Sequence, residues 1–452
     1  MESIKEFIID KERINKVIHS NLFLAIVTML LFVSWLFSLE VLSCITIVGT
    51  IIISSIYSDN ANILGALLFL VMISFPTLPY FNTIPIYLVI ELIAFFVGGG
   101  YLIYKKIKNK TFSFKLGPIG LSMIILPIMC LVCETVRHIT PFNSNSEFIL
   151  FGYMGVLFIL MITIAYFMLY LGGINNKDNH FSKVFLCVNI LLLLEALSIF
   201  ISNGFQPIDF NLLKWGEKNT FALGLEICLP FIALLYDRNH KKIYYVLLLI
   251  VDYVFIVLSI SRGGTFTSIM LLPLLIFIEL YSLKNRGKVC RIIFVMSLCL
   301  IPICYFFVPG VKEAVDNMFT KGLELAYRDI IWEEALVYYR NNPLFGGGIS
   351  SMFDINVIIN GEGNAVFYAH NTFITLLSTC GVIGILSFII LLIEMINVIY
   401  NIKSNEKFVY IFFVLVGLIH GLFDNTFYSI LYMLPLIYIF ANKGLKGIEY
   451  KK

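Results

Sequence analysis

Apolar residues follow one another in long runs along the whole chain, and short polar segments separate these runs. A run of about 20 apolar residues crosses a hydrocarbon core of roughly 30 Å as a helix. Helices are expected because hydrocarbon offers the backbone no hydrogen-bond partners. The pattern therefore predicts an all-α fold, a polytopic transmembrane helix bundle of about 12 to 14 spans. The predicted spans are 21–38, 39–57, 62–80, 82–104, 119–135, 147–172, 183–201, 219–236, 243–260, 265–283, 292–308, 371–399, 408–421 and 427–441.

The longest interruption of the pattern is residues 309–370, which are predicted to form one long loop. Inside it, residues 323–340 contain no Gly or Pro and are predicted to be helical. The helix is expected to end at Asn341-Asn342-Pro343, since a proline disfavours helix in the residue before it. Gly346 to Gly348 then make a flexible turn. A loop of this length is usually functional or disordered. Its many aromatic residues argue against disorder and favour a lid on the membrane surface.

The composition strengthens this interpretation. The chain has 452 residues, 59% of them hydrophobic and 13% charged, with a mean hydropathy of +0.91. A soluble domain needs far more polar surface, so the lipid bilayer is the expected surrounding. Residues 1–20 mix basic and acidic side chains, and we expect no cleaved signal.

The nine cysteines lie in or beside apolar runs and are interpreted as small buried hydrophobes. Cys130 and Cys133 form a CxxC without a second ligand pair, which argues against a zinc site. The net charge of +3 gives no reason to expect nucleic acid as a partner.

The distribution of basic residues predicts the orientation of the chain. When the N-terminus is placed in the cytoplasm, the cytoplasmic segments contain the basic clusters at 104–110, 237–242 and 284–291 and the tail 442–452. Basic clusters favour the cytoplasmic side. We therefore expect a multi-pass protein of the cytoplasmic (inner) membrane with both termini inside and loop 309–370 outside. All but eight of the 32 Lys and Arg then lie inside, the exceptions being Arg137, Lys214, Lys218, Arg262, Lys312, Lys321, Arg328 and Arg340.

Arg262 stands in a tight turn between two predicted spans, in the sequence Ser261-Arg262-Gly263-Gly264. An arginine at a helix end can simply reach the lipid headgroups. The two glycines favour another role, because they let the backbone turn sharply and leave amide N–H groups able to point at an anion. An arginine fork beside such amides suits a phosphate.

Two further candidates lie in the long loop and at its end. Arg328 follows Glu324 by four residues, so it could form an ordinary ion pair on the surface of the predicted helix. His370 and Asn371 stand where the loop re-enters the membrane. A histidine at this place can cap the helix or act as a base, because its charge changes near neutral pH. The residues by themselves leave both alternatives open.

Three segments, in this order, resemble the O-antigen ligase and O-antigen polymerase family. They are SRGG at 261–264, YRDIIWEEALVYYRNNPLFGGG at 327–348 and AHNTFITLLSTCGVIGILSFI at 369–389. The resemblance covers residues 205–430, including GEKNTFALGLEICLP at 216–230 and HGLFDNTF at 420–427. It divides the chain into N-terminal transmembrane helices 1–204, a family-like region 205–441 that includes loop 309–370, and a basic cytoplasmic tail 442–452.

The resemblance implies a GT-C-like bundle and a glycosyltransferase that needs no cofactor. The sequence has no outward-facing DxD motif to hold Mg²⁺, so a metal-independent reaction is expected. The enzyme's donor would be an oligosaccharide on a polyprenyl diphosphate such as undecaprenyl diphosphate, and a flippase and chain-length regulator proteins would be its partners. Arg262 and Arg328 would bind the diphosphate, and His370 would be the general base on the acceptor hydroxyl. Two arginines can offset a diphosphate's charge without a metal. The implied catalytic residues are His370, Arg328 and Arg262, and the implied substrate-binding residues are Arg262, Gly263, Gly264, Arg328, Gly346, Gly348 and Asn371.

Alternative functions remain. A polymerase adds the growing chain to another lipid-linked repeat unit, whereas a ligase transfers it to a lipid core or a protein. Richness in Ile, Asn and Lys suits a low-GC genome without lipopolysaccharide and favours a capsule or exopolysaccharide polymerase. A polysaccharide flippase or small-anion transporter is the rival class, since ionisable groups inside spans often mark ion paths, although no internal repeat supports it. The acidic residues within predicted spans are Glu91, Glu195, Glu226, Asp252 and Glu394.

Overall fold

The computed structural model describes residues 12–58, 86–139, 146–173, 180–205, 218–238, 244–261, 263–268, 305–306, 312, 316, 328–353, 356–359, 362–365, 369–402 and 407–449. Within these residues, six helices are long and apolar enough to cross a membrane, or seven if the bent pair Glu12–Ile18 and Asn21–Leu36 is one span. The described chain is thus a helical multi-pass membrane protein, as predicted. The predicted span 62–80 and most of 265–283 and 292–308 lie outside the described residues.

The described chain divides into two compact units that are interleaved along the sequence. The first unit comprises Met1–Phe114, Met168–Thr320 and Ser404–Val416, and the second comprises Lys115–Phe167, Lys321–Lys403 and Gly417–Lys452. Two helices run across the division, α7 (Ser146–Gly172) and α16 (Lys407–His420). The sequence-based division at residue 204 stays a prediction.

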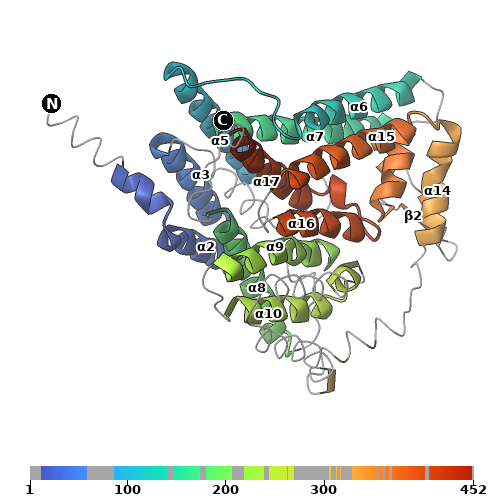
Figure 1. Ribbon diagram of the computed structural model, residues 1–452. Helices are drawn as coiled ribbons and strands as arrows, with labels where there is room; N and C mark the ends of the chain where they lie inside the picture. The colour runs from blue at the N-terminus through green and yellow to red at the C-terminus, as the bar shows by residue number, and fades with distance from the viewer. Residues whose placement is uncertain are drawn as a thin grey trace. The chain divides into compact units, whose positions relative to one another are not determined.

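The first unit is built from apolar helices that pack one against the next (Figure 1). α2 packs against α3 and α8, α3 against α5, α8 against α9, and α9 against α10. The carbonyl groups at the end of α3 are capped from α5, since Lys105 Nζ donates to the carbonyls of Ser55 (2.8 Å) and Ile56 (2.7 Å). The helices are α2 (Asn21–Leu36), α3 (Glu40–Tyr57), α5 (Ile86–Lys108), α8 (His180–Ser202), α9 (Lys218–Arg238) and α10 (Tyr244–Leu258).

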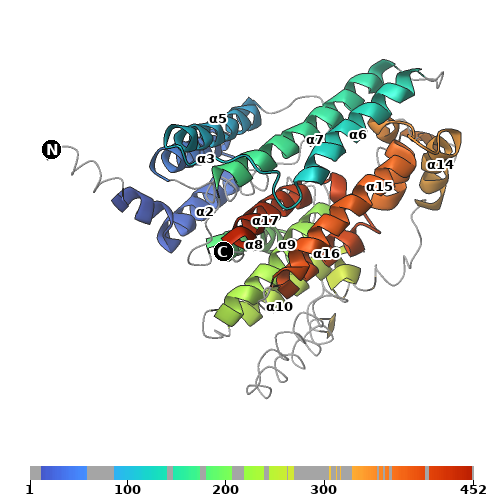
Figure 2. The same ribbon diagram turned by 45° about the horizontal axis from the view of Figure 1, so that its top comes forward.

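The second unit is organised around one long helix, α15 (Thr372–Tyr400). It packs against α6 (Gly120–Ile139), α14 (Arg328–Asn341) and α17 (Ile430–Glu449), and α14 lies beside it in two views (Figures 1 and 2). Two short 3-10 helices, η2 (Ile349–Phe353) and η3 (Thr426–Tyr428), also contact α15. The helix predicted at 323–340 is confirmed from Arg328 onward, because residues 321–327 lie outside the described residues.

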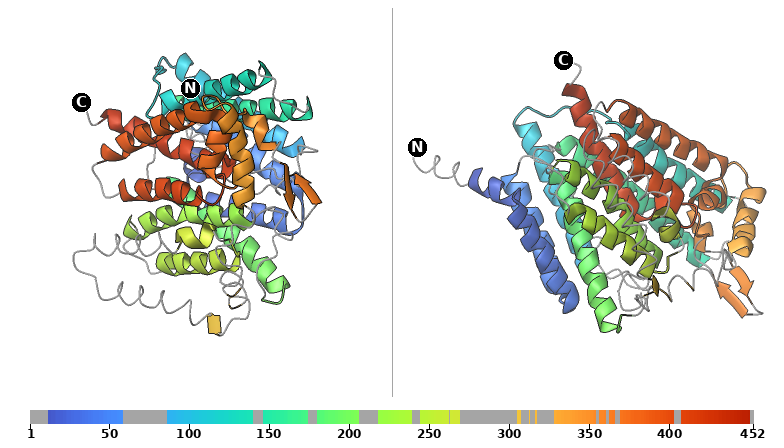
Figure 3. Two further views of the ribbon diagram at one scale, coloured as in Figure 1. Left: turned by 90° about the vertical axis from the view of Figure 1, so that its right-hand side faces the viewer. Right: turned by 60° about the horizontal axis from the view of Figure 1, so that its bottom comes forward.

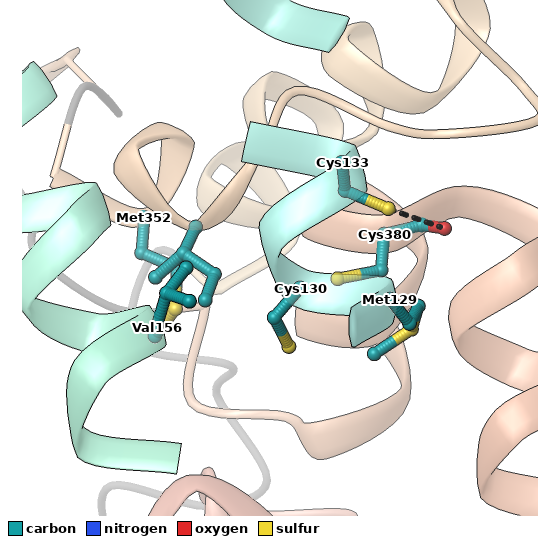
Figure 4. Close-up of a cluster of buried hydrophobic side chains, with 7 residues drawn as sticks. Met129, Cys130, Cys133, Val156, Met352 and Cys380 are labelled. Atoms are coloured by element: carbon teal, nitrogen blue, oxygen red, sulfur yellow. Dashed lines mark hydrogen bonds between the residues drawn. The ribbon is translucent and has the colours of Figure 1, made fainter. Parts of the chain in front are cut away.

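A compact hydrophobic cluster joins α6, α7, η2 and α15 (Figure 4). Three of its members are Cys130, Cys133 and Cys380, and the Cys133 thiol points to the carbonyl of Cys380 at 3.9 Å. These cysteines are buried, as expected of small hydrophobes. Through Cys380, the cluster packs against α15 directly before Gly381. Its buried members are Met129, Cys130, Cys133, Val156, Ile349, Met352 and Cys380.

The predicted loop also contains a small antiparallel hairpin, which the sequence did not indicate. Strand β1 (Asn356–Ile359) pairs with β2 (Glu362–Ala365), with Ile359 opposite Glu362 next to the turn. β1 contacts α14, and the two strands stand beside that helix in Figure 3. The all-α prediction is therefore confirmed for the helical body, and the hairpin is a local exception within the loop.

Candidate functional site

Helix α15 is interrupted at Gly381, where the backbone takes φ 58° and ψ −150°. An interrupted helix leaves amide and carbonyl groups without intrahelical partners. Residues 343–348, here called the glycine loop, provide these partners through backbone hydrogen bonds. The turn predicted after α14 is therefore seated in the break of a transmembrane helix. The bonds run from the Gly347 amide to the Ser378 carbonyl (2.7 Å), Gly348 to Thr379 (2.8 Å), Val382 to Pro343 (2.9 Å) and Ile383 to Leu344 (3.2 Å).

The glycines of this loop are required by its close approach to α15. Gly346 and Gly348 have φ of 65° and 75°, in the left-handed region that favours glycine. A Cβ at Gly346 would lie 2.7 Å from the carbonyl oxygen of Ser378, a backbone atom that cannot move aside. The structure thus explains Gly346 and Gly348 by packing, and their predicted contact with substrate stays a prediction.

The start of α15 carries the predicted base. His370 immediately precedes the helix cap, and its φ of 47° lies in the left-handed region where histidine is enriched. Its Nδ1 lies 3.4 Å from Oδ1 of Asp424, in the turn between α16 and α17. The two side chains are 26% and 18% exposed, so the pair is open to an incoming molecule.

Asp424 is held in its charged form. Burial by itself would raise the pKa of this carboxyl. The hydrogen bond from His370, the nearby His370 and His420 rings, and the Asn425 amide (2.8 Å to Oδ1) together lower the pKa below its ordinary value. A carboxylate that stays ionised beside an imidazole can orient the ring and stabilise its protonated form.

Asn371, not His370, caps α15. Its Oδ1 accepts from the amides of Phe373 (2.9 Å) and Ile374 (3.1 Å), the standard arrangement at a helix start. Its Nδ2 donates to the Leu422 carbonyl (3.0 Å), which ties the cap to the turn that carries Asp424. The capping alternative for His370 is therefore wrong, and Asn371 has a structural role of its own.

The turn and the helix start are joined by further bonds. Thr372 donates from its amide to the Gly421 carbonyl (2.8 Å) and from its hydroxyl to the Asp424 carbonyl (3.0 Å). The Thr375 hydroxyl donates to Asn425 Oδ1 at 2.6 Å. These contacts fix the backbone on both sides of the imidazole–carboxylate pair.

Arg328 is the first residue of α14, and its helix is tied to the same place. Trp332, one helical turn later on the same face, donates from Nε1 to the carbonyl of Ala369 at 2.7 Å. Ile331 and Ala335 pack against Ala369 in a small hydrophobic cluster. Because Ala369 directly precedes His370, the α14 end that carries Arg328 is held next to the predicted base.

The remaining predicted residues are Arg262, Gly263 and Gly264. Arg262 is outside the described residues, and Gly263 and Gly264 belong to the first unit, where residues 263–268 are helical. The Gly264 amide donates to Ser261 Oγ (3.0 Å), and a Cβ at this position would collide with the Cβ of Ala222. Gly264 is thus explained by packing, and its amide is engaged within the protein. A phosphate-binding role for Arg262 and Gly263 stays a prediction.

Three side chains near the site were not singled out from the sequence. Asp424 lies in the segment HGLFDNTF at 420–427. It is 54 positions from His370 in the sequence, so the sequence does not indicate that the two side chains are in contact. Glu134 and Arg137 on α6 contact the glycine loop region, with Arg137 Nη1 donating to the Gly347 carbonyl at 2.9 Å. The available signal was an acid and an arginine near the end of an apolar span, where ionisable residues are uncommon.

The helices define the class of the protein, a multi-pass helical membrane protein, and the loop of this site is seated in the break of one of its spans. Residues 244–389, from α10 to the middle of α15, match a family described as O-Antigen ligase. The match supports the assignment of the chain to the O-antigen ligase and polymerase family and a function of that general type. A search of curated proteins finds no match.

Proposed function

We propose that the chain is a metal-independent membrane glycosyltransferase that joins polyprenyl-diphosphate-linked oligosaccharide repeat units at the outer face of the cytoplasmic membrane. The observation that supports this most is the His370–Asp424 pair at the start of α15, with the Arg328 end of α14 tied to the residue next to it. We favour polymerisation of a capsule or exopolysaccharide. Transfer to a lipid core or a protein is the alternative, because the same side chains would serve it.

The proposed chemistry begins at the imidazole. With its proton on Nδ1, His370 donates to the Asp424 carboxylate and keeps the lone pair of Nε2 for a substrate. Nε2 then takes the proton of the acceptor sugar hydroxyl as that oxygen attacks the anomeric carbon of the donor. Asp424 stabilises the imidazolium that forms, as a carboxylate does in other imidazole-based sites.

The same step breaks the bond between the anomeric carbon and the diphosphate oxygen. The polyprenyl diphosphate leaves with the bonding electrons, and its growing negative charge requires positive partners. A guanidinium offers two parallel N–H donors to phosphate oxygens, and Arg328, the first residue of α14, is the proposed partner. Arg262 is proposed as the second such partner on the evidence of its Arg-Gly-Gly sequence.

Deletion of the gene, followed by sizing of the surface polysaccharide and the lipid-linked pool, tests the proposal. Loss of long chains with survival of single repeat units supports a polymerase. Accumulation of full-length lipid-linked chains identifies a ligase. If both pools are unchanged, the glycosyltransferase proposal is wrong.

The arginines are tested by Arg262→Lys and Arg328→Lys in the complemented deletion strain. Lysine keeps the charge but loses the fork, so diphosphate binding predicts a large loss of polymer for both variants. A headgroup or surface-pair role predicts nearly normal polymer, since such contacts contribute little. Arg340→Lys, at the other end of α14, is the matched control, and its polymer is expected to be normal.

A further inference from the structure

One side of the glycine loop bonds to the break of α15. On the other side, two buried side chains of α6 hold the loop. Glu134 accepts twice from Ser350, from the amide at Oε2 (3.0 Å) and from the hydroxyl at Oε1 (2.6 Å). Arg137 donates to the Gly347 carbonyl (2.9 Å), and its guanidinium lies 5.7 Å from the ring centre of Tyr338 on α14. Glu134 is fully buried and Arg137 almost so. Charged side chains are almost never fully buried unless they are paired.

The packing around Glu134 leaves it little freedom. A Cβ at Gly152 of α7 would collide with Glu134 Oε1, and a Cβ at Gly348 would lie 2.6 Å from Oε2. Two glycines therefore make room for one carboxylate, which in turn fixes Ser350. The glycine loop is thus enclosed between the break of α15 and the end of α6.

These contacts determine where α14 lies. One end of the helix is tied through Trp332 to Ala369, beside His370. Its other end continues directly into the glycine loop, where Arg137 contacts Tyr338. If the loop left the break, this second end of α14 would lose its connection to α15, and we expect the position of Arg328 to be less fixed.

We infer that Glu134 and Arg137 are positioning residues for the transfer reaction, although both lie outside the segment 244–389 that matches the family. This inference rests on the proposed function. The two side chains seat the glycine loop, the loop fixes one end of α14, and the other end of α14 carries Arg328 and is tied to Ala369 beside His370. They touch neither the acceptor hydroxyl nor the diphosphate in this scheme.

The experiment uses Glu134→Gln, which keeps one acceptor oxygen, and Ser350→Ala as a milder change of the same contact. Losing one charge-assisted hydrogen bond lowers the equilibrium constant for seating the loop in the break about 10- to 100-fold. We expect kcat per folded enzyme to fall about tenfold. The double variant Glu134→Gln/Ser350→Ala is expected to have the same kcat as Glu134→Gln alone, because both substitutions weaken the same contact between Glu134 and Ser350. The pH profile should keep its shape, since the His370–Asp424 pair is unchanged. Arg137→Lys, which retains a donor, should keep more activity than Arg137→Met.

A second measurement reports on seating without the reaction. Cys380 is fully buried beside the break, so it should resist N-ethylmaleimide while the loop is seated. Mass spectrometry of the Cys380 peptide should show faster labelling in Glu134→Gln and Ser350→Ala than in the wild type. Thr135→Val, an exposed position between the two residues, is the control for both measurements.

Each result decides between roles. Normal kcat in Glu134→Gln overturns the inference, and so does a lower kcat with unchanged Cys380 labelling. A lower yield of folded protein with normal kcat per folded molecule assigns Glu134 a structural role only. If the wild type transfers no sugar but Cys380 labelling still rises in the variants, the proposed function fails while the seating of the loop stands.

Discussion

Two carboxylates, one in each unit, have opposite surroundings. Asp424 lies in a turn, faces an imidazole and is partly exposed. Asp252 lies inside α10, is fully buried and accepts from the amide nitrogen of Asn189 on α8 at 2.8 Å. Its second oxygen has no hydrogen-bond partner among the described residues. Only the first carboxylate combines a titratable neighbour with access for a substrate.

Acidic residues inside spans are the feature that favours the rival transporter function. Burial of an acid in a membrane helix is not enough for ion passage. A path also needs access and a further group to receive the ion. The Asn189–Asp252 pair joins two neighbouring helices, as interhelical polar pairs in membrane proteins do. We therefore expect chemistry at Asp424 and structural support at Asp252.

The largest effect is expected from His370→Asn. Asparagine tolerates the left-handed backbone at this position, so the variant removes the base and little else. The rate should fall about 10²- to 10⁴-fold, the usual contribution of a positioned base. Polymer yield in the complemented strain and initial rates on purified protein measure it. An active variant would place the chemistry elsewhere and remove the distinction between the two carboxylates.

Asp424→Asn is expected to lower the rate about 10- to 100-fold, the scale of one charge-assisted hydrogen bond. It should also destabilise the protein in a pH-dependent way. Because the pKa of Asp424 is lowered in the folded state, its stabilisation is present above the unfolded carboxyl pKa of about 3.9 and is lost as pH falls through the lowered value. Melting temperatures of wild type and variant should therefore differ at neutral pH and converge in strong acid. Equal melting temperatures at every pH would contradict the assignment.

Asn189→Ala tests the other carboxylate by stability. It leaves Asp252 buried without its donor, which should cost about 1–3 kcal/mol and lower the melting temperature in detergent. The rate per folded molecule should be unchanged. Ser198→Ala, on the same helix with a hydroxyl bonded to its own Leu194 carbonyl, should be nearly neutral. Loss of turnover in folded Asn189→Ala would return the transporter-like path to consideration.

The smallest effect is expected from Asp252→Asn. The new amide keeps an oxygen for Asn189 Nδ2 and gains a donor for Asn189 Oδ1, so stability should change by less than about 1 kcal/mol. Turnover should stay close to that of the wild type, because no contact of the proposed site is changed. Strongly reduced polymer at normal expression would show that the charge of Asp252 matters after all.

Much of the helical body could be predicted because hydrophobic runs are a local property of the chain. The predicted span 371–399 is observed as Thr372–Tyr400, and 183–201 as His180–Ser202. The stop of the loop helix at Asn341 also followed from Pro343. Neighbouring residues determine each of these features.

The break of α15 and the contacts of the site could not be predicted, because they depend on residues distant in sequence. An isolated glycine such as Gly381 is often tolerated within an apolar helix, and its break depends on the glycine loop about 35 residues earlier in the chain. Asp424 reaches His370 only after the turn that follows α16 has joined the start of α15. Sequence identified His370 and Arg328 as candidates by resemblance, whereas Glu134 and Arg137 came from packing alone.

The composite nature of α15 has a consequence for biosynthesis. Two carbonyls and two amides of residues 343–348 complete the hydrogen bonding of this helix. These residues precede α15 in the chain, so they leave the ribosome before α15. Unsatisfied backbone groups are costly in hydrocarbon, so we expect α15 to settle in the bilayer together with the preceding segment. A fragment that begins after residue 348 contains all of α15 but lacks the backbone groups that complete the hydrogen bonding of this helix. Truncation mapping of membrane insertion in this region has to start before Pro343.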